Sequence, residues 1–531
     1  MNNIGQELIT ALSAQGVDVI FGIPGVHTIE LYRGLQGASI RHVTPRHEQG
    51  AGFMADGYAR VSGRPGVAFV ITGPGFTNTL TAMGQARADS IPIIVVSSEN
   101  PLNQLRQGKG LLHELPDQHG LASLIAVDAF QIKSAEDLNP AIEKIFETFA
   151  SKRPGPVHIE IPLDVTPKPF DVLKGQDQTA LKPRPDTSLI TKAVETLKGS
   201  KTPVIIAGGG AKNSSQSIKI LAEQCDAPLV QTVNARGVLH NHPLSVPASP
   251  SLNAVRTLIE QADVVLALGT EFGQTDFDMY ATNTMPQIKK LIRVDRGVHQ
   301  LTTTPDALAI HGDVDEVLAI INAEMADKQA DGDGALRAKN ARDEAFEEIG
   351  EDMQRLTLFL NEIRNVCPDA IMVGDSAQPI YAGNLYYDHD RSAGWFNAAT
   401  GFGALGYAIP AAIGAAIADP DADVICLTGD GGAQFSLPEL MVAKEENLNI
   451  TFIIWNNHGY QEISTSMQAV GVEPIGCKPK PPIFEDIAKA YGIPFQQCTS
   501  KKGATAASIK IAKQSTGPAV IEVIDTDQIK A

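Results

Sequence analysis

The chain has 531 residues and a formal net charge of −18 at pH 7. A chain of this length is too long for one hydrophobic core and suits three domains of roughly 100–200 residues each. The excess of acidic residues argues against a nucleic-acid-binding protein, because clustered Lys and Arg hold phosphate backbones. No stretch approaches the roughly 18 apolar residues of a membrane span, and the N-terminus lacks the basic and apolar regions of a secretion signal. We therefore expect a cytoplasmic protein that contacts neither nucleic acid nor membrane.

The N-terminal region is expected to form the first domain, at residues 1–168. Its last strand is predicted at residues 157–162 (Val-His-Ile-Glu-Ile-Pro). Residues 166–185 carry several prolines among polar residues. This composition predicts a linker that leaves the domain.

A middle domain is predicted at residues 186–325. Apolar runs at residues 203–207, 264–269 and 290–295 alternate with helical patterns, which indicates a second parallel sheet. Gly208, Gly209 and Gly210 follow the first of these strands. They lack the complete glycine fingerprint of a dinucleotide-binding loop, so we interpret them as a packing turn.

The third domain is predicted at residues 355–531, after a charged region at residues 323–354 that we interpret as a second linker carrying a solvated helix. Strands are expected at residues 370–375, 424–428 and 450–455, where short apolar runs suit buried parallel strands. The carboxyl ends of such strands meet at one edge of the sheet, where open α/β sheets bind ligands.

A glycine-rich run, Gly429-Asp430-Gly431-Gly432, follows the strand at residues 424–428. Glycines let backbone N–H groups approach an anion, and a helix predicted at residues 437–443 would add its positive end. Mg²⁺ prefers oxygen ligands and rarely receives all six from protein. Asp430, Asn457 and the Gly459 carbonyl would supply three of them. An ordinary turn has the same composition as Gly-Asp-Gly, but the two strands and Asn457 favour a magnesium-bound diphosphate.

Gly-Asp-Gly followed by Asn-Asn resembles the cofactor-binding domain of thiamine diphosphate enzymes. Four further segments resemble the pyrimidine-binding domain of the acetolactate synthase and 2-oxoacid decarboxylase family: residues 21–25 (Phe-Gly-Ile-Pro-Gly), 46–51 (Arg-His-Glu-Gln-Gly-Ala), 55–60 (Ala-Asp-Gly-Tyr-Ala-Arg) and 72–78 (Thr-Gly-Pro-Gly-Phe-Thr-Asn). The resemblance implies an α/β fold of three domains with parallel sheets flanked by helices. The first and third would be thiamine diphosphate-binding folds and the middle one Rossmann-like.

The resemblance implies that Glu48 is the decisive catalytic residue. In the family, a buried glutamate hydrogen-bonds the cofactor aminopyrimidine and favours the imino tautomer that removes the thiazolium C2 proton. Leu405 would be the apolar wedge that bends the cofactor, and Gly403 would contact its pyrimidine. The other implied cofactor contacts are Pro24, Gly25, Thr72, Asn78, Ser376, Ala377, Gln378, Gly429, Asp430, Gly431, Gly432, Asn457, Gly459 and Tyr460.

Family members also place this glutamate and the diphosphate site on different subunits. The resemblance therefore implies a homodimer or homotetramer with active sites between subunits. Residues 269–277 depart from the arginine-containing segment of the flavin-binding synthases, which disfavours FAD. A non-catalytic protein on this scaffold is disfavoured as well, because Glu48 and the metal ligands are all present.

Residues 22–35, 46–62 and 113–118 are most similar to family members that decarboxylate 5-guanidino-2-oxopentanoate. This implies loss of CO2 from a basic 2-oxoacid to give an aldehyde. Candidate substrate contacts are Val26, His27, Glu114 and Glu462, since a carboxylate binds guanidinium through paired bonds. His27 and His113 are candidates for proton transfer or for holding the substrate carboxylate. Solvated charges and structural histidines are the alternative interpretations. An acetolactate synthase-like carboligase, which captures a second carbonyl compound, is the alternative function.

Overall fold

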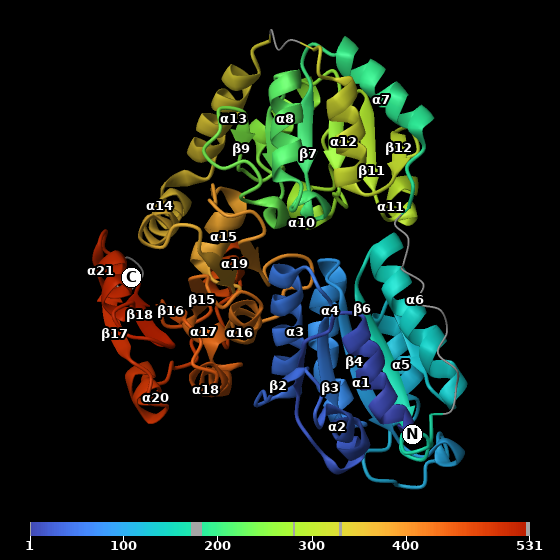
Figure 1. Ribbon diagram of the computed structural model, residues 1–531. Helices are drawn as coiled ribbons and strands as arrows, with labels where there is room; N and C mark the ends of the chain where they lie inside the picture. Colours follow the sequence, from blue (N-terminus) through green and yellow to red (C-terminus); the bar gives the residue numbers. More distant parts are fainter. Residues whose placement is uncertain (1, 171–182, 280–281, 329–331, 527–531) are drawn as a thin grey trace.

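The computed structural model describes residues 2–170, 183–279, 282–328 and 332–526. It contains three six-stranded sheets, and Figure 1 shows each of them flanked by helices. This arrangement confirms the expected α/β fold of three domains with parallel sheets. Within the described ranges, every helix is too short or too polar to cross a bilayer.

The first sheet has the strand order β2-β1-β3-β4-β6-β5, and all of its pairs are parallel. Its central strands are fully buried, which explains their continuous apolar sequences. The strand expected at residues 157–162 is confirmed as β6. The elements are β1 (Val19–Gly22), β2 (Arg41–Val43), β3 (Gly66–Val70), β4 (Ile93–Glu99), β5 (Asp128–Gln131), β6 (Pro156–Pro162), α1 (Ile4–Ala14), α2 (Ile29–Leu35), α3 (Glu48–Ser62), α4 (Pro74–Ala88), α5 (Gln118–Ile125) and α6 (Leu138–Ser151).

The middle sheet has the order β12-β11-β10-β7-β8-β9 and is also parallel. The three strands expected here are confirmed as β7, β10 and β11. A Cβ added at Gly208 would collide with the carbonyl of Gly269, and one at Gly210 would lie a tight 3.0 Å from the Gly269 backbone, so close packing favours glycine at both positions. The elements are β7 (Val204–Ala207), β8 (Leu229–Gln231), β9 (Ser245–Val246), β10 (Val265–Leu268), β11 (Leu291–Asp295), β12 (Leu308–His311), α7 (Thr187–Gly199), α8 (Ser215–Cys225), α9 (Asn253–Gln261), α10 (Gln274–Phe277), α11 (Val298–Thr302) and α12 (Val314–Glu324).

The third sheet has the order β14-β13-β15-β16-β18-β17. β13, β15 and β16 are parallel neighbours, so their carboxyl ends meet at one edge, as expected. The elements are β13 (Ile371–Gly374), β14 (Trp395–Asn397), β15 (Val424–Gly429), β16 (Ile450–Asn456), β17 (Phe495–Thr499), β18 (Ala519–Ile524), α15 (Gln378–Leu385), α16 (Ala408–Ala418), α17 (Asp430–Ala433), α18 (Leu440–Glu445), α19 (Gln461–Ala469), α20 (Phe484–Ala490) and α21 (Ala504–Ala512).

The charged region at residues 323–354 differs from the expected linker with a solvated helix. It contains α13 (Gly334–Glu348) and the start of α14 (Gly350–Val366). Ala338, Ala341 and Ala345 of α13 are buried in the same apolar cluster as residues of α9. Alanines at this spacing form a narrow apolar stripe along the helix. The many charged residues around them make the segment appear polar when only its composition is considered. Residues 329–331 of this region, and 171–182 of the first expected linker, lie outside the described ranges.

The first and third domains meet where α3 packs on α16. A Cβ added at Gly57 would collide with the carbonyl of Ala411, and one at Gly414 with the carbonyl of Met54. Glycine therefore permits the close approach of the two helices. This contact fixes α3, and with it Glu48, against the third domain.

Candidate cofactor site

The glycine-rich run lies at the carboxyl edge of the third sheet, where β15 ends at Gly429. The short helix α17 begins at once with Asp430, and a Cβ added at Gly431 would collide with the ring of Tyr460. The helix expected at residues 437–443 is found. It begins as a 3₁₀ turn, Leu437–Glu439, and continues as α18, while Gly431 and Gly432 lie within α17.

Three oxygen atoms converge beside this run. Oδ1 of Asn457 lies 3.2 Å from Oδ1 of Asp430 and 2.8 Å from the carbonyl oxygen of Gly459. Oδ2 of Asp430 is buried and has no hydrogen-bond partner among the described residues. Rotating the Asn457 amide would let its nitrogen donate to both oxygens, but the unpartnered Asp430 oxygen would remain. The cluster therefore fits a hard cation, which takes carboxylate, amide and carbonyl oxygens together.

Burial raises the pKa of Asp430 to about 6. A carboxyl group removed from water without a partner favours its neutral form. A bound cation would reverse this preference, because it stabilises the carboxylate. The electrostatics of Asp430 thus agree with the geometry of the oxygen cluster.

The start of α15 faces the same edge. Nδ2 of Asn457 donates to Oε1 of Gln378 at 3.0 Å. Ala377 is the N-cap of α15 and has no side-chain hydrogen bond to the helix, and it lies 3.7 Å from the position of a Cβ on Gly429. Ser376 is half-buried, lies two residues after the end of β13 and leads into this cap. The N–H groups of Ala377 and Gln378, which precede Pro379 at this helix start, are suited to an anion such as a diphosphate.

Asp375 is a site residue that the sequence interpretation missed. Its buried carboxylate accepts hydrogen bonds from the N–H groups of Ser376 at 2.8 Å and Gly406 at 2.9 Å. It therefore ties the loop of Gly403 and Leu405 to the end of β13. Burial raises its pKa to about 6. Its place directly after an apolar strand was the only available signal.

The loop before α16 carries the residues expected at the pyrimidine. Gly403 has a φ of 74°, which favours glycine, and Leu405 is half-buried. Phe402 lies against α4, where a Cβ on Gly84 would collide with its ring. The loop thus touches the first domain of the same chain.

Glu48 is the first residue of α3. Its Oε2 accepts a hydrogen bond of 2.9 Å from Nδ2 of Asn78 on α4. Nδ1 of His47, the N-cap, accepts the N–H of Gln49 at 3.1 Å. Two predicted cofactor contacts, Glu48 and Asn78, therefore lie side by side at the carboxyl edge of the first sheet.

His27 and His113 form an edge-to-face ring pair with centroids 5.0 Å apart. Nδ1 of His27 lies 3.2 Å from Oγ1 of Thr72, whose hydroxyl donates to Ser98 at 3.0 Å. Because the Thr72 proton is used in that bond, Nδ1 of His27 is the donor and its Nε2 keeps a lone pair. Burial and the neighbouring His113 lower the pKa of His27. His27 is therefore a neutral base near pH 7.

The remaining predicted residues lie near the His27–His113 pair or on α19. Pro24 and Gly25 follow β1, and a Cβ on Gly25 would lie 2.6 Å from Ile71. Val26 is 68% exposed. The Glu114 carboxylate accepts N–H groups of its own loop, including that of Gly110 at 2.7 Å, and these bonds lower its pKa. Glu462 lies exposed on α19.

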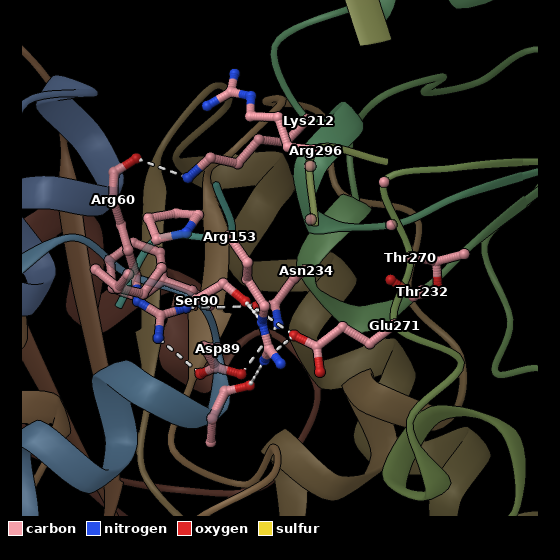
Figure 2. A pocket seen from close by; sticks show the side chains of 18 of the residues that line it. Arg60, Asp89, Ser90, Arg153, Lys212, Thr232, Asn234, Thr270, Glu271 and Arg296 are labelled. Atoms are coloured by element: carbon pink, nitrogen blue, oxygen red, sulfur yellow. Dashed lines mark hydrogen bonds and ion pairs between the residues drawn. The ribbon is translucent and has the colours of Figure 1, made fainter. Parts of the chain in front are cut away.

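A cavity of about 370 Å³ lies elsewhere, at the junction of the three domains. Figure 2 shows Arg60 directed toward Asp89, and Arg153 toward Glu271. Of the described residues that line it, none is a predicted cofactor contact. The candidate cofactor contacts therefore lie apart from this cavity.

Comparison with known proteins identifies all three domains. Models of the thiamine pyrophosphate enzyme family match residues 2–121 (N-terminal TPP binding domain), 190–321 (central domain) and 376–523 (C-terminal TPP binding domain). The chain is 40% identical to a probable 2-ketoarginine decarboxylase of Pseudomonas aeruginosa over 505 residues, covering 93% of this chain and 89% of that protein. It is 30% identical to the large subunit of acetolactate synthase isozyme 1 of Escherichia coli, covering 98% and 94%. A probable acetolactate synthase large subunit of Methanocaldococcus jannaschii is 30% identical, covering 92% and 86%. The chain belongs to the thiamine pyrophosphate enzyme family.

Proposed function

We propose that the protein is a thiamine diphosphate- and Mg²⁺-dependent decarboxylase of a basic 2-oxoacid, with 5-guanidino-2-oxopentanoate as the preferred substrate. The observation that carries the proposal is the 40% identity, over 93% of the chain, to a probable 2-ketoarginine decarboxylase. The oxygen cluster of Asp430, Asn457 and Gly459 supports the magnesium assignment. The products are CO2 and an aldehyde.

The third domain would hold the diphosphate end of the cofactor. Asp430, Asn457 and the Gly459 carbonyl would bind Mg²⁺. The N–H groups of Ala377, Gln378 and the Gly429–Gly432 run would bind phosphate oxygens. Tyr460 and Gln378 would complete this half of the site, since Tyr460 packs on Gly431 and Gln378 contacts Asn457.

Glu48 would activate the cofactor. When bound, thiamine diphosphate supplies a carbon nucleophile and an electron sink for the bond that breaks in a 2-oxoacid. Glu48 would exchange a proton with the pyrimidine ring, and Asn78 would hold its carboxylate in place. Leu405 and Gly403 would fix the shape of the cofactor, because reaction requires the reacting atoms to be held close together.

The substrate would lie between the carboxyl edge of a first-domain sheet and the carboxyl edge of a third-domain sheet. Nε2 of His27 is available as a proton acceptor, and His113 lies beside it. These side chains would bind the substrate carboxylate or move a proton at the reacting carbon. Val26, Glu114 and Glu462 would contact the substrate side chain. A carboxylate that faces a guanidinium group forms paired, charge-assisted bonds.

We infer a homodimer as the minimal active unit, with a tetramer as its common extension. Large apolar side chains that adjoin the candidate site residues are exposed. Leu112, beside His113, is 61% exposed, and Phe435, after α17, is 58% exposed. Contact with a second subunit would remove these apolar side chains from water. A second subunit that covers them would enclose the site.

An acetolactate synthase-like carboligase is the second candidate, because two of the relatives named above are acetolactate synthases at 30% identity. A panel of 2-oxoacids, incubated with protein, thiamine diphosphate and Mg²⁺, separates the two. We expect the aldehyde of 5-guanidino-2-oxopentanoate as the main product. An acyloin or acetohydroxyacid as the main product would establish the carboligase instead, and peroxide formation would indicate an oxidase.

A further inference from the structure

Glu439 of the third domain holds the chain segment that leads into α3 of the first domain. Its Oε1 accepts the N–H groups of Arg46 at 3.1 Å and of His47 at 3.0 Å, and its Oε2 accepts that of Arg46 at 3.0 Å. Glu439 is 1% exposed. A buried carboxylate with several N–H donors is a strong and oriented contact. The contacted residues, Arg46 and His47, immediately precede Glu48, the first residue of α3.

Gly50 makes room for this contact. A Cβ at Gly50 would collide with the carboxylate of Glu439, so the side chain lies directly against the first turn of α3. The N–H groups at and before a helix start have no partner within the helix. His47 caps α3 from within the first domain, and Glu439 holds the preceding backbone from the third domain.

Two neighbouring acidic residues make contacts of a different kind. Glu445 forms an ion pair with the guanidinium group of Arg46, and the Glu445 side chain is 51% exposed. Glu446 pairs in the same way with Arg41. Exposed ion pairs contribute little because solvent screens them. The buried contact to the backbone is therefore the one that fixes the start of α3.

We propose that Glu439 is a positioning residue for Glu48, and that it sets the direction of the Glu48 carboxylate across the boundary between the two domains. This inference rests on the proposed function. Loss of the Glu439 contact lets the first turn of α3 move, and small displacements of a catalytic group are costly. The effect falls on cofactor activation and leaves substrate affinity unchanged.

The test compares Glu439→Gln with Glu445→Gln, a matched control that removes an acidic partner of the same Arg46. The first readout is amide hydrogen exchange of residues 46–50 in the protein without cofactor. The second is exchange of the thiamine C2 proton at saturating cofactor and Mg²⁺, followed by NMR. We expect Glu439→Gln to speed the amide exchange and to slow C2 exchange by about tenfold or more, with kcat reduced and KM unchanged. Glu445→Gln should stay within about twofold of the wild type in both.

Wild-type C2 exchange in folded Glu439→Gln would overturn the positioning role, and so would an equal loss in Glu445→Gln. If Glu439→Gln does not fold, Gly50→Ala takes its place, because the added methyl group displaces the Glu439 carboxylate. Wild-type C2 exchange in Gly50→Ala, or an equal loss in Glu445→Gln, would then overturn the positioning role. Glu48→Gln separates this inference from the proposed function. Normal C2 exchange in Glu48→Gln would contradict the activating role that the proposed function gives Glu48, whereas slow exchange there with normal exchange in Glu439→Gln contradicts the positioning role alone.

Discussion

Asn78 and Glu48 meet through a hydrogen bond of 2.9 Å, although they lie on different helices of the first domain. Asn78 is on α4 and donates to Oε2 of the Glu48 carboxylate. The bond fixes the plane of a half-exposed side chain that would otherwise move among rotamers. A carboxylate held in this way is prepared for a proton transfer whose geometry matters.

The first prediction concerns this pair. Glu48→Gln should leave the fold intact and slow C2 proton exchange of bound cofactor by on the order of a hundredfold or more, because an amide cannot exchange a proton with the pyrimidine ring. Asn78→Ala keeps the Glu48 carboxylate and removes only the hydrogen bond that orients it. We therefore expect a smaller decrease, about tenfold, in the rate of C2 exchange. Quenched-exchange NMR measures both variants. A Glu48→Gln variant that exchanges at the wild-type rate contradicts the assignment.

The second prediction concerns the oxygen cluster at Asp430. Asp430→Ala should abolish Mg²⁺-dependent binding of thiamine diphosphate in a calorimetric titration, whereas Asp421→Ala, at an exposed position after α16, should bind normally. Because burial raises the pKa of Asp430 to about 6, protons compete with the metal below that pH. Metal affinity should therefore fall as the pH decreases through 6. Affinity that is independent of pH between 5 and 7 would argue against Asp430 as a ligand.

Residues that follow a strand directly could be predicted from the sequence, and residues that act across a domain boundary could not. Asp430 and Asn457 end neighbouring apolar strands, so local patterns bring them to one edge. Glu439, by contrast, reads as an ordinary residue of a helix predicted at residues 437–443. Its partner Arg46 is 393 positions away in the chain, and no local pattern reports such a contact.

Contacts with elements distant in sequence also explain why residues 323–354 are wrongly predicted to be a linker with a solvated helix. The buried stripe of α13 consists of alanines, whose small apolar surface is outweighed by the surrounding charges in any composition. Only α9, an element distant in sequence, shows which face of α13 is buried. The apolar sequence of a buried strand itself indicates that the strand is buried. For this reason every strand expected in the middle domain is found.

The third prediction concerns Asp89, which joins all three domains. Its carboxylate accepts hydrogen bonds from Arg60 of the first domain at 2.6 Å, from Asn234 of the middle domain at 3.2 Å and from Thr400 of the third domain at 3.0 Å. Asp89→Ala leaves the buried Arg60 with Asp56 as its carboxylate partner and takes an acceptor from Asn234 and Thr400, and leaving a buried donor without its acceptor typically costs about 1–3 kcal/mol. The midpoint of urea denaturation should fall accordingly. Glu30→Ala, which breaks an exposed pair with Arg33, should change stability by less than about 1 kcal/mol. Equal effects of the two variants would contradict the role of Asp89.

The fourth prediction concerns His158, which is fully buried beside Phe76 and bonded to Ser97 at 2.8 Å. Burial lowers its pKa to about 3. The unfolded chain takes up a proton near the ordinary pKa of about 6.5 and the folded chain does not, so His158 stabilises the fold above that pH. This contribution is lost as the pH falls from 6.5 toward 3. His158→Gln should flatten the decline of the denaturation midpoint over this range, and exposed His299→Gln should not. An unchanged slope in His158→Gln would show that the histidine is not buried in its neutral form.

The fifth prediction tests whether the site is shared between subunits. Glu48→Gln and Asp430→Ala are each expected to be inactive, because each removes one half of the site. If the halves come from different chains, a mixed dimer has one site with both defects and one site with none. Refolding the two variants together in equal amounts should therefore restore about a quarter of wild-type activity, since half of the dimers are mixed and each has one intact site. Refolding either variant alone is the control and should restore none. If both halves come from the same chain, every site in every dimer carries one defect, and the mixture stays inactive.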